Sequence, residues 1–195
     1  MSTAPRGGNT IAVPGTLGPG AAGEAKGTGG LLQRGGTPQP SALAAQVSLR
    51  PARSSDQHFA SRLYLQSTKE LLAPGRRWDR ARQLKRFARG YKREYVQLIR
   101  YHGADVGWTQ ISESAESFHL HQIHLLVRVR GRGIGTFFIT ALQERARARG
   151  KPVSLNVMRG NRAIALYKRL GFRIVGKDDE KFRMRWRARP PGRTP

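Results

Sequence analysis

The sequence predicts a single mixed α/β (α+β) domain in which helices flank a twisted, mostly antiparallel sheet. Three observations predict it: a start rich in Gly and Pro, a strand-and-turn pattern in the middle of the chain, and a strand–helix–strand–helix order in its second half. Taken along the chain, the expected elements are β-α-α-β-β-β-α-β-α-β(β), an order that favours an α/β or α+β fold.

The first 45 residues are expected to form a disordered tail. Residues 1–40 hold eleven of the 23 Gly and five of the 11 Pro residues, a share typical of aperiodic disordered segments. The same residues interrupt any apolar stretch long enough to serve as the core of a signal peptide. We therefore expect the domain to span residues 46–189, with a second short disordered tail at residues 190–195.

The first half of the domain is expected to hold short strands and two helices. Residues 47–51 alternate like a strand that stops at a proline, and residues 54–56 supply a cap for the first helix. Asp79 is expected to cap a second helix, whose apolar stripe is Leu84, Phe87, Ala88 and Tyr91. Residues 95–99 and 106–111 then form a hairpin, and residues 118–126 a longer third strand.

The second half alternates regularly between helices and strands. A helix over residues 134–149 ends at Gly150, and a buried strand follows at residues 153–157. Asn161 is expected to cap a helix that ends at Gly171, with Phe172 in the hydrophobic position after the cap. Residues 172–176 and 181–187 close the domain as a hairpin.

Composition and charge exclude several classes of protein. The chain has no Cys, which excludes disulfides, a Cys nucleophile and thiolate metal sites. No apolar run approaches the ~18 residues of a membrane span, so we expect a soluble, cytoplasmic protein with no membrane partner. The 36 basic and 12 acidic residues give a net charge of +24. Such a charge favours an anionic partner, although codon usage can also enrich Arg.

The segment at residues 125–136 combines a strand, a Gly-rich turn and the start of a helix. Gly131, Gly133 and Gly135 let backbone amides approach an anion closely, and the helix N-terminus adds partial positive charge. The P-loop pattern is absent, and the dinucleotide-binding pattern fails at Thr136 and lacks its later acidic residue. Taken alone, the segment indicates either an anion-binding turn or an ordinary tight turn.

Residues downstream extend this segment into a longer pattern. Arg130, Gly133 and Gly135 are followed by Asn161, Ala163, Leu166, Tyr167, Gly171 and Phe172. Together they resemble the GCN5-related N-acetyltransferase (GNAT) family, which uses acetyl-coenzyme A, and only Ala163 departs by one position from the commonest spacing. The resemblance covers about residues 46–189, and the expected order of elements is also that of the family.

The resemblance implies a set of residues that bind acetyl-coenzyme A. The amides of residues 130–136 would hold the pyrophosphate, and the strand at residues 125–127 would pair with the pantetheine arm. The amide of Leu125 or Leu126 would face the acyl oxygen as it gains negative charge. Asn161 would bond to the cofactor arm, and Tyr167 would protonate the departing thiolate. The full implied set is Leu125, Leu126, Val127, Arg130, Gly131, Arg132, Gly133, Ile134, Gly135, Thr136, Asn161 and Tyr167. A helix cap at Asn161 and a core position at Tyr167 are the alternatives.

The third strand carries three histidines, and two of them, His119 and His121, are candidates for the base that removes the acceptor's proton. His119 and His121 are expected on one face of the strand and His124 on the other. The His-x-His pair resembles that of arylalkylamine N-acetyltransferases, where two imidazoles relay the proton of the amine through water. Packing in the sheet and metal binding are the alternatives, although no third ligand shares the face and we expect no metal. Glu113 and Glu116 are alternative bases.

The acceptor is expected to be a primary amine that carries an anionic group. Residues 76–93 hold nine basic residues and one acidic residue, so this surface should repel a polycation. A different class of function is a basic nucleic-acid-binding module with vestigial catalysis, in which Trp78, Phe87 and Tyr91 offer stacking groups. The sequence does not determine the oligomeric state, and a homodimer stays open.

Overall fold

The computed structural model describes residues 40–71 and 77–188, which form a layer of helices on each side of a seven-stranded sheet. The strand order is β1-β2-β3-β4-β5-β7-β6. Each neighbouring pair is antiparallel except β4 and β5, which run parallel. The mixed, mostly antiparallel sheet that the sequence predicts is therefore confirmed. The bounds of the strands are Val47–Pro51 (β1), Val96–Tyr101 (β2), Ala104–Glu113 (β3), Phe118–Leu125 (β4), Val153–Met158 (β5), Arg173–Lys177 (β6) and Lys181–Trp186 (β7).

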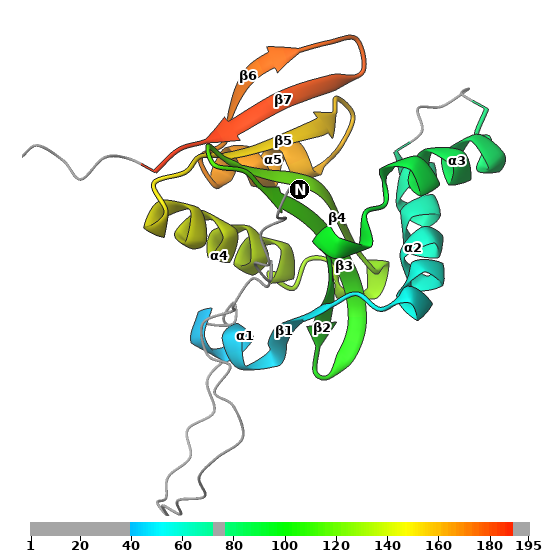
Figure 1. Ribbon diagram of the computed structural model, residues 1–195, viewed down its shortest axis with the longest axis horizontal. Helices are drawn as coiled ribbons and strands as arrows, with labels where there is room; N and C mark the ends of the chain where they lie inside the picture. The colour runs from blue at the N-terminus through cyan, green and yellow to red at the C-terminus, as the bar shows by residue number, and fades with distance from the viewer. Residues whose placement is uncertain (1–39, 72–76, 189–195) are drawn as a thin grey trace, which may run out of the picture.

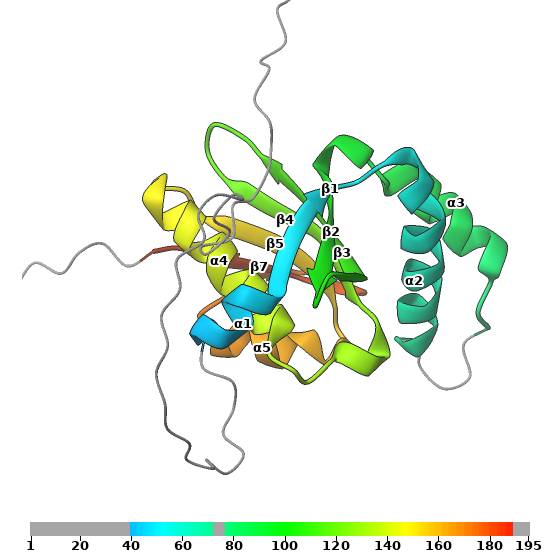
Figure 2. The ribbon, with the colours of Figure 1, turned by 90° about the horizontal axis from the view of Figure 1, so that it is seen from below.

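Helices cover both faces of this sheet. In both ribbon views, α2 and α3 lie together on one side of the sheet, and α1, α4 and α5 lie on the other (Figures 1 and 2). The bounds of the helices are Pro40–Gln46 (α1), Gln57–Glu70 (α2), Arg80–Gly90 (α3), Ile134–Ala148 (α4) and Ala163–Arg169 (α5), and short 3₁₀ turns are Ser54–Asp56 (η1), Arg93–Tyr95 (η2) and Val127–Val129 (η3). Within the described ranges, no helix is long and apolar enough to cross a membrane.

Separate hydrophobic clusters attach each helical layer to the sheet. Phe118 and Leu120 of β4 pack with Phe138 and Leu142 of α4 in one cluster. On the other face, Trp108 of β3 packs with residues of α2 and α3. Each Å² of apolar surface buried in these clusters contributes about 25 cal/mol of free energy, and this holds the layers together. The sheet thus presents one face to the α4 layer and the other to the α2–α3 layer, with the end of β4 between them.

The predicted caps are found where the sequence placed them. The Asp79 carboxylate accepts the amide of Arg82 at 2.9 Å at the start of α3. The Asn161 side chain accepts the amide of Ala163 at 2.8 Å before α5. The amide of Phe172 donates to the carbonyl of Tyr167 at 2.9 Å, and Phe172 is buried. This is the helix ending that Gly171, at φ +83°, makes possible.

Helix α1 differs from the expected start of the domain. Residues 40–45 were assigned to the N-terminal tail, but they form a helix whose Leu43 is buried. Leu43 packs with Val47 of β1, Ile99 of β2 and Ile134 of α4, so burial of its apolar side chain holds this segment against the domain. The remaining tail predictions, for residues 1–39 and 190–195, lie outside the described residues.

Candidate active site

The site begins where β4 and β5 separate. The two parallel strands pair only at Phe118↔Val153, His119↔Ser154 and Leu120↔Leu155. Beyond these pairs β4 continues to Leu125 and β5 to Met158, and the two strands no longer pair with each other. The gap opens into a cleft of about 700 Å³ that is lined from both faces of the sheet. Residues lining it include His119, Leu120, His121, Gln122, Ile123, His124, Leu155, Asn156, Val157, Met158, Asn161 and Tyr167.

The open edge of β4 leaves particular backbone amides free of the neighbouring strand β3. Leu125 lies opposite Gly107, and the next amide, that of Leu126, donates to the carbonyl of Val106 at 2.9 Å. In an antiparallel ladder this pattern makes Leu125 a non-hydrogen-bonded position, so its amide points away from β3 toward the gap. By the same alternation the amide of Ile123 points there too. Of the two amides that the sequence left open, that of Leu125 therefore faces the cleft, and that of Leu126 is already bonded.

The end of β4 differs from the strand expected over residues 125–127. The strand stops at Leu125, and Val127 begins the 3₁₀ turn η3. The chain turns here because the amide of Val129 donates to the carbonyl of Leu126 and that of Arg130 to Val127, each at 3.1 Å. The strand therefore ends two residues earlier than expected. The amide of Arg130 is hydrogen-bonded within the turn, so it does not contribute to an anion site.

The turn after η3 has the geometry of an anion-binding site at a helix N-terminus. Gly131 and Gly133 have φ values of +78° and +81°, in the left-handed region that favours Gly. Helix α4 starts at Ile134 and is 15 residues long, and amides of its first turn lack partners within the helix. These amides and the helix dipole favour a bound phosphate group.

Arg130 is directed back onto the protein rather than into the turn. Its Nε donates to the carbonyl of Leu125 at 3.0 Å, and its guanidinium forms an ion pair with Glu70 of α2. Both contacts hold the end of β4 against the α2 layer. The side chain of Arg130 thus fixes the strand end beside the cleft.

A β-bulge in β4 brings the candidate pair His119 and His121 and the third histidine of the strand, His124, to one face. Gln110 pairs with Gln122 but Ile111 pairs with Leu120, so His121 is an extra residue in β4. An extra residue reverses the alternation of every later side chain. His124 therefore lies on the α2 face with His119 and His121, and the expectation that it takes the opposite face was wrong. Its ring stacks on Trp108 at 4.8 Å and meets the edge of Tyr64 at 5.6 Å.

His119 and His121 form a pair with a defined hydroxyl partner for each ring. Their ring centroids lie 4.5 Å apart. His119 Nδ1 lies 2.9 Å from Ser154 Oγ, and His121 Nε2 lies 2.8 Å from Ser112 Oγ. Burial lowers the pKa of both imidazoles below the usual 6.5, and the charge of His121 lowers that of His119 further. Both rings are therefore neutral near pH 7 and able to accept a proton.

His124 has a different environment from this pair. Burial, with a smaller contribution from the positive charge of Arg130, lowers the pKa of His124 to about 3. Its Nε2 lies 2.9 Å from Gln122 Oε1, an oxygen that can only accept, so the ring donates from Nε2. Stacked on Trp108, the ring forms part of the cleft wall and stays neutral at working pH.

Tyr167 lines the cleft from the second half of α5, and Asn161 lines it from the segment before that helix. Tyr167 is buried, packs on Phe172 with ring centroids 5.7 Å apart, and lies in the cleft lining. Burial raises its pKa to about 12, so the phenol keeps its proton throughout the physiological range. Tyr167 is therefore a buried side chain of the core cluster that also lines the cleft.

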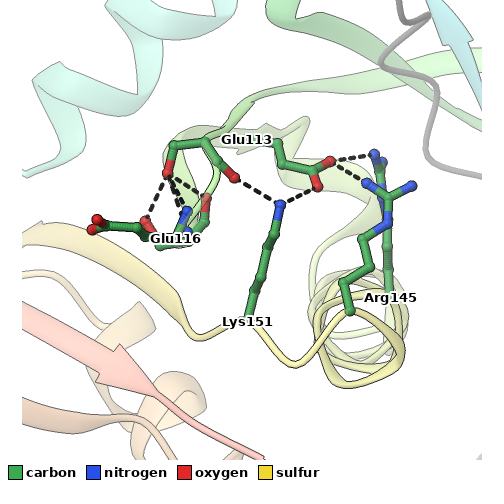
Figure 3. A network of polar contacts seen from close by, with 7 residues as sticks. Glu113, Glu116, Arg145 and Lys151 are labelled. Atoms are coloured by element: carbon green, nitrogen blue, oxygen red, sulfur yellow. Dashed lines mark hydrogen bonds and ion pairs between the residues drawn. The ribbon is translucent and has the colours of Figure 1, made fainter.

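The two carboxylates named as alternative bases lie outside the cleft lining. Glu113 is held by three cations, Arg145, Arg149 and Lys151, at the far end of β3 (Figure 3). Burial alone would raise the pKa of Glu113, but hydrogen bonds from Lys151 and Arg149 outweigh it and lower the pKa. Glu116 is exposed in the turn before β4 and points away from this network (Figure 3). Neither arrangement suits a base for the cleft.

Several cleft residues were not singled out from the sequence. Asn156 lines the cleft, and Ser112 and Ser154 lie behind it as the hydroxyl partners of His121 and His119, on strands whose polar positions looked like ordinary exposed faces. Tyr64, Gln83 and Arg86 approach from α2 and α3. Asp179 and Glu180 approach from the turn between β6 and β7, and Lys181 from the start of β7. Their convergence depends on how distant elements pack, and no local spacing signals it. Over the described part of the chain, no group of three or more His, Cys, Asp or Glu side chains could hold a metal.

Comparison with known proteins supplies the last observations. Residues 59–172 match the model of the acetyltransferase (GNAT) family. The N-acetyltransferase PaiA of Thermoplasma acidophilum, solved with coenzyme A, superposes with a TM-score of 0.61 at 15% identity over 73% of this chain and 99% of that chain. The ribosomal-protein-S18-alanine N-acetyltransferase of Escherichia coli superposes with a TM-score of 0.55 at 19% identity, over 75% of this chain and 97% of that chain. At these identities the structures support the fold alone. No curated protein matches the sequence.

Proposed function

The chain belongs to the acetyltransferase (GNAT) family and is an acyltransferase that uses acetyl-coenzyme A, and from this premise we propose that it acetylates a primary amine by direct attack in a ternary complex. Acetyl-coenzyme A supplies an acetyl group activated as a thioester. With no Cys in the chain, an acyl-cysteine intermediate is excluded, so the acceptor itself attacks. The proposal rests most on one observation, the open amide edge of β4 beside the Gly-rich turn.

The residues of this edge fit the donor that the family uses. The amides of Ile123 and Leu125 face the gap, where an extended amide-bearing arm can pair with them as a strand would. Amides from Gly131 to Thr136 lie at the N-terminus of α4, where a pyrophosphate is favoured. The Leu125 amide is our candidate donor to the acyl oxygen as negative charge develops there.

His119 is our candidate for the base that takes the proton of the acceptor. The hydroxyl of Ser154 donates to the carbonyl of Phe118 at 3.2 Å, so its oxygen accepts from Nδ1–H of His119. This tautomer leaves the lone pair on Nε2, the atom free to accept a proton directly or through water. His121, 4.5 Å away, is the second member of the proposed relay.

Tyr167 is our candidate for the acid on the other side of the gap. The phenol lies in the cleft lining and its raised pKa keeps it protonated. It can therefore donate its proton to the departing sulfur, after which the thiol leaves without charge. Base and acid reach the cleft from opposite faces of the sheet, since His119 lies on the α2 face and Tyr167 belongs to α5.

The acceptor class follows from the charges around the mouth of the cleft. Arg86 from α3 and Lys181 from β7 offer cations, and Asp179 and Glu180 offer carboxylates. We propose an acceptor that carries an anionic group as well as its amine, the anion directed to Arg86 and the ammonium to the acidic turn. Positive and negative side chains together at the mouth of the cleft complement such a molecule better than they complement a plain alkylamine.

Release of free thiol from acetyl-coenzyme A, measured over a panel of primary amines, tests this function. The panel pairs each plain alkylamine with an analogue bearing a carboxylate or phosphate. Amine-dependent thiol release, with a lower KM for the anionic analogues, is expected. Arg86→Gln should raise that KM about tenfold while leaving the plain amines unaffected. Release of thiol at one rate with and without any amine would contradict the proposal.

A further inference from the structure

The surface of α3 that is directed away from the protein core carries a row of basic side chains. At 3.6 residues per turn, Arg82, Lys85, Arg86 and Arg89 fall within an arc of about 100°, opposite the buried Phe87. All four side chains are exposed. We call these four residues the α3 basic face.

The charge of this region is concentrated and uncompensated. Residues 77–93 contain eight basic residues and one acidic residue, Asp79, whose carboxylate caps α3. Across the residues that the structure describes, Arg50, Arg130 and Arg145 are held in ion pairs, whereas the four side chains of the α3 basic face are in none. Like charges this close repel one another, and an anionic partner relieves that repulsion.

The chemistry of the face selects among anionic partners. Phe87 is buried, and Tyr91 packs on Phe87 and Trp108, so these rings do not offer the base-stacking surface expected from the sequence. Trp78 is half-buried beside Lys69. Because the described residues of α3 include no exposed aromatic ring, stacking of single-stranded bases on this face is disfavoured. Without an apolar wedge on the same face, insertion into a lipid surface is disfavoured as well.

We propose that the α3 basic face docks this enzyme on the phosphate backbone of a nucleic-acid duplex without regard to base sequence. The four side chains follow one another over about 10 Å of helix axis at 1.5 Å per residue, a length that spans several phosphates of a duplex strand. Arg groups, three of the four, bind phosphate through two parallel hydrogen bonds.

The position of the face gives the docking a consequence for acetylation. Arg86 and Gln83 of the same helix line the mouth of the cleft, so a docked duplex lies beside the acceptor entrance. An acceptor amine on a protein bound to that nucleic acid would then be presented at high local concentration. This consequence rests on the proposed function, whereas the docking itself does not.

Two charge-matched triple variants test the docking. Arg82→Gln, Lys85→Gln and Arg89→Gln remove three charges from the α3 basic face without touching a residue of the cleft lining. Arg173→Gln, Arg185→Gln and Arg187→Gln remove three exposed charges from β6, β7 and the segment that follows. Circular dichroism and thermal melting verify the fold of both. Fluorescence anisotropy of a labelled 20-base-pair duplex then gives affinity against salt concentration.

For the full-length protein we expect log K against log salt concentration to fall with a slope near −3.6, the value for about four phosphate contacts. The α3 variant should show a slope shallower by about 2.7 and an affinity about 10²-fold lower at 0.15 M salt. The control variant should keep most of the affinity, and both should acetylate a plain amine as the unsubstituted protein does.

Three results would overturn the docking. An equal loss of affinity in both triple variants would mean that net charge alone binds the duplex. Tighter binding to the single strand than to the duplex would remove the duplex as the partner. Tighter binding to vesicles of anionic lipid would assign the face to a membrane surface. Because anisotropy needs no acetyl transfer, a failed docking and a failed enzymatic function give separate readouts.

Discussion

The Nδ1 atom of His119 on β4 lies 2.9 Å from the Oγ atom of Ser154 on β5, at the middle one of the three residue pairs that join the two strands. The Ser154 hydroxyl also donates to the carbonyl of Phe118, which commits its single proton. His119 must therefore carry its proton on Nδ1 when neutral. Ser154 thus acts as a positioning residue that leaves Nε2 of His119 as the proton acceptor.

Replacing Ser154 tests this tautomer. Ser154→Ala should lower kcat/KM about five- to tenfold, the effect of one hydrogen bond of about 1 kcal/mol, with little change in KM for acetyl-coenzyme A. Ser154→Thr keeps the hydroxyl and should restore most of the rate. The ¹⁵N chemical shifts of the His119 ring report the tautomer directly, and an Nδ1–H signature that persists in the Ala variant would argue against a positioning role.

The histidine pair predicts the form of the pH–rate profile. A base works when deprotonated, so kcat/KM should rise with pH through an apparent pKa that belongs to the pair. Since burial lowers both pKa values, this rise should be centred below about 6.5. The double variant His119→Gln, His121→Gln should lose it and retain only the rise due to ionisation of the acceptor amine. A double variant with the unsubstituted profile would end the relay hypothesis.

Tyr167 predicts a loss confined to the chemical step. Tyr167→Phe keeps the ring against Phe172 but removes the proton donor, so kcat should fall about 10²- to 10³-fold with little change in acetyl-coenzyme A affinity. Because the pKa is raised to about 12, Tyr167 should add no falling limb to the profile below about pH 10. A decrease in kcat of less than threefold would leave Tyr167 as a packing residue.

His124 predicts how stability changes with pH. Its pKa is about 3 in the folded protein and ~6.5 in the unfolded chain, so between these values the unfolded state binds one more proton. Stability is therefore lost as the pH falls through this window, by up to about 1.4 kcal/mol per pH unit. Denaturant unfolding between pH 6.5 and 5 should show a slope that His124→Phe reduces by about that amount. An unchanged slope would mean that His124 is not held neutral.

Local patterns in the sequence predicted the elements and the turn, because caps, Gly positions and hydrophobic periods act over a few residues. Asn161, Gly171 and Asp79 act where the sequence placed them. The prediction that His124 lies on the opposite face was wrong, because the bulge at His121 arises from the pairing of β4 with β3. A β-bulge leaves no mark in the strand's own alternation when polar residues fill both faces.

The candidate site required contacts between residues far apart in the chain. Ser154 contacts His119 although the two residues are 35 positions apart in the chain. No pattern around either residue predicts this contact. Glu113 looked available as a base because the cations that bind it, Arg145, Arg149 and Lys151, come from 32 to 38 residues later. The sequence could therefore nominate donors and acceptors but could not tell which were already engaged.

The Gly-rich turn gives a prediction with a matched control elsewhere in the fold. Gly133 at φ +81° opens α4, and Gly103 at φ +77° lies in the turn between β2 and β3. An added Cβ at Gly133 would meet only Leu43 at 3.7 Å, and at Gly103 nothing within 4 Å. Replacing either by Asp should therefore cost a similar ~1–2 kcal/mol of backbone strain without a clash.

Only one of these two substitutions places a negative charge where we expect the pyrophosphate. Gly133→Asp should weaken acetyl-coenzyme A binding about 10²- to 10³-fold, since like charges at ~4 Å repel by a few kcal/mol near a protein surface. Gly103→Asp should bind as the unsubstituted protein does. Isothermal titration calorimetry at one temperature, well below both melting points, makes the comparison. Affinity unchanged from that of the unsubstituted protein in both variants would place the pyrophosphate elsewhere, whereas an equal loss of affinity in both would trace the effect to backbone strain rather than charge.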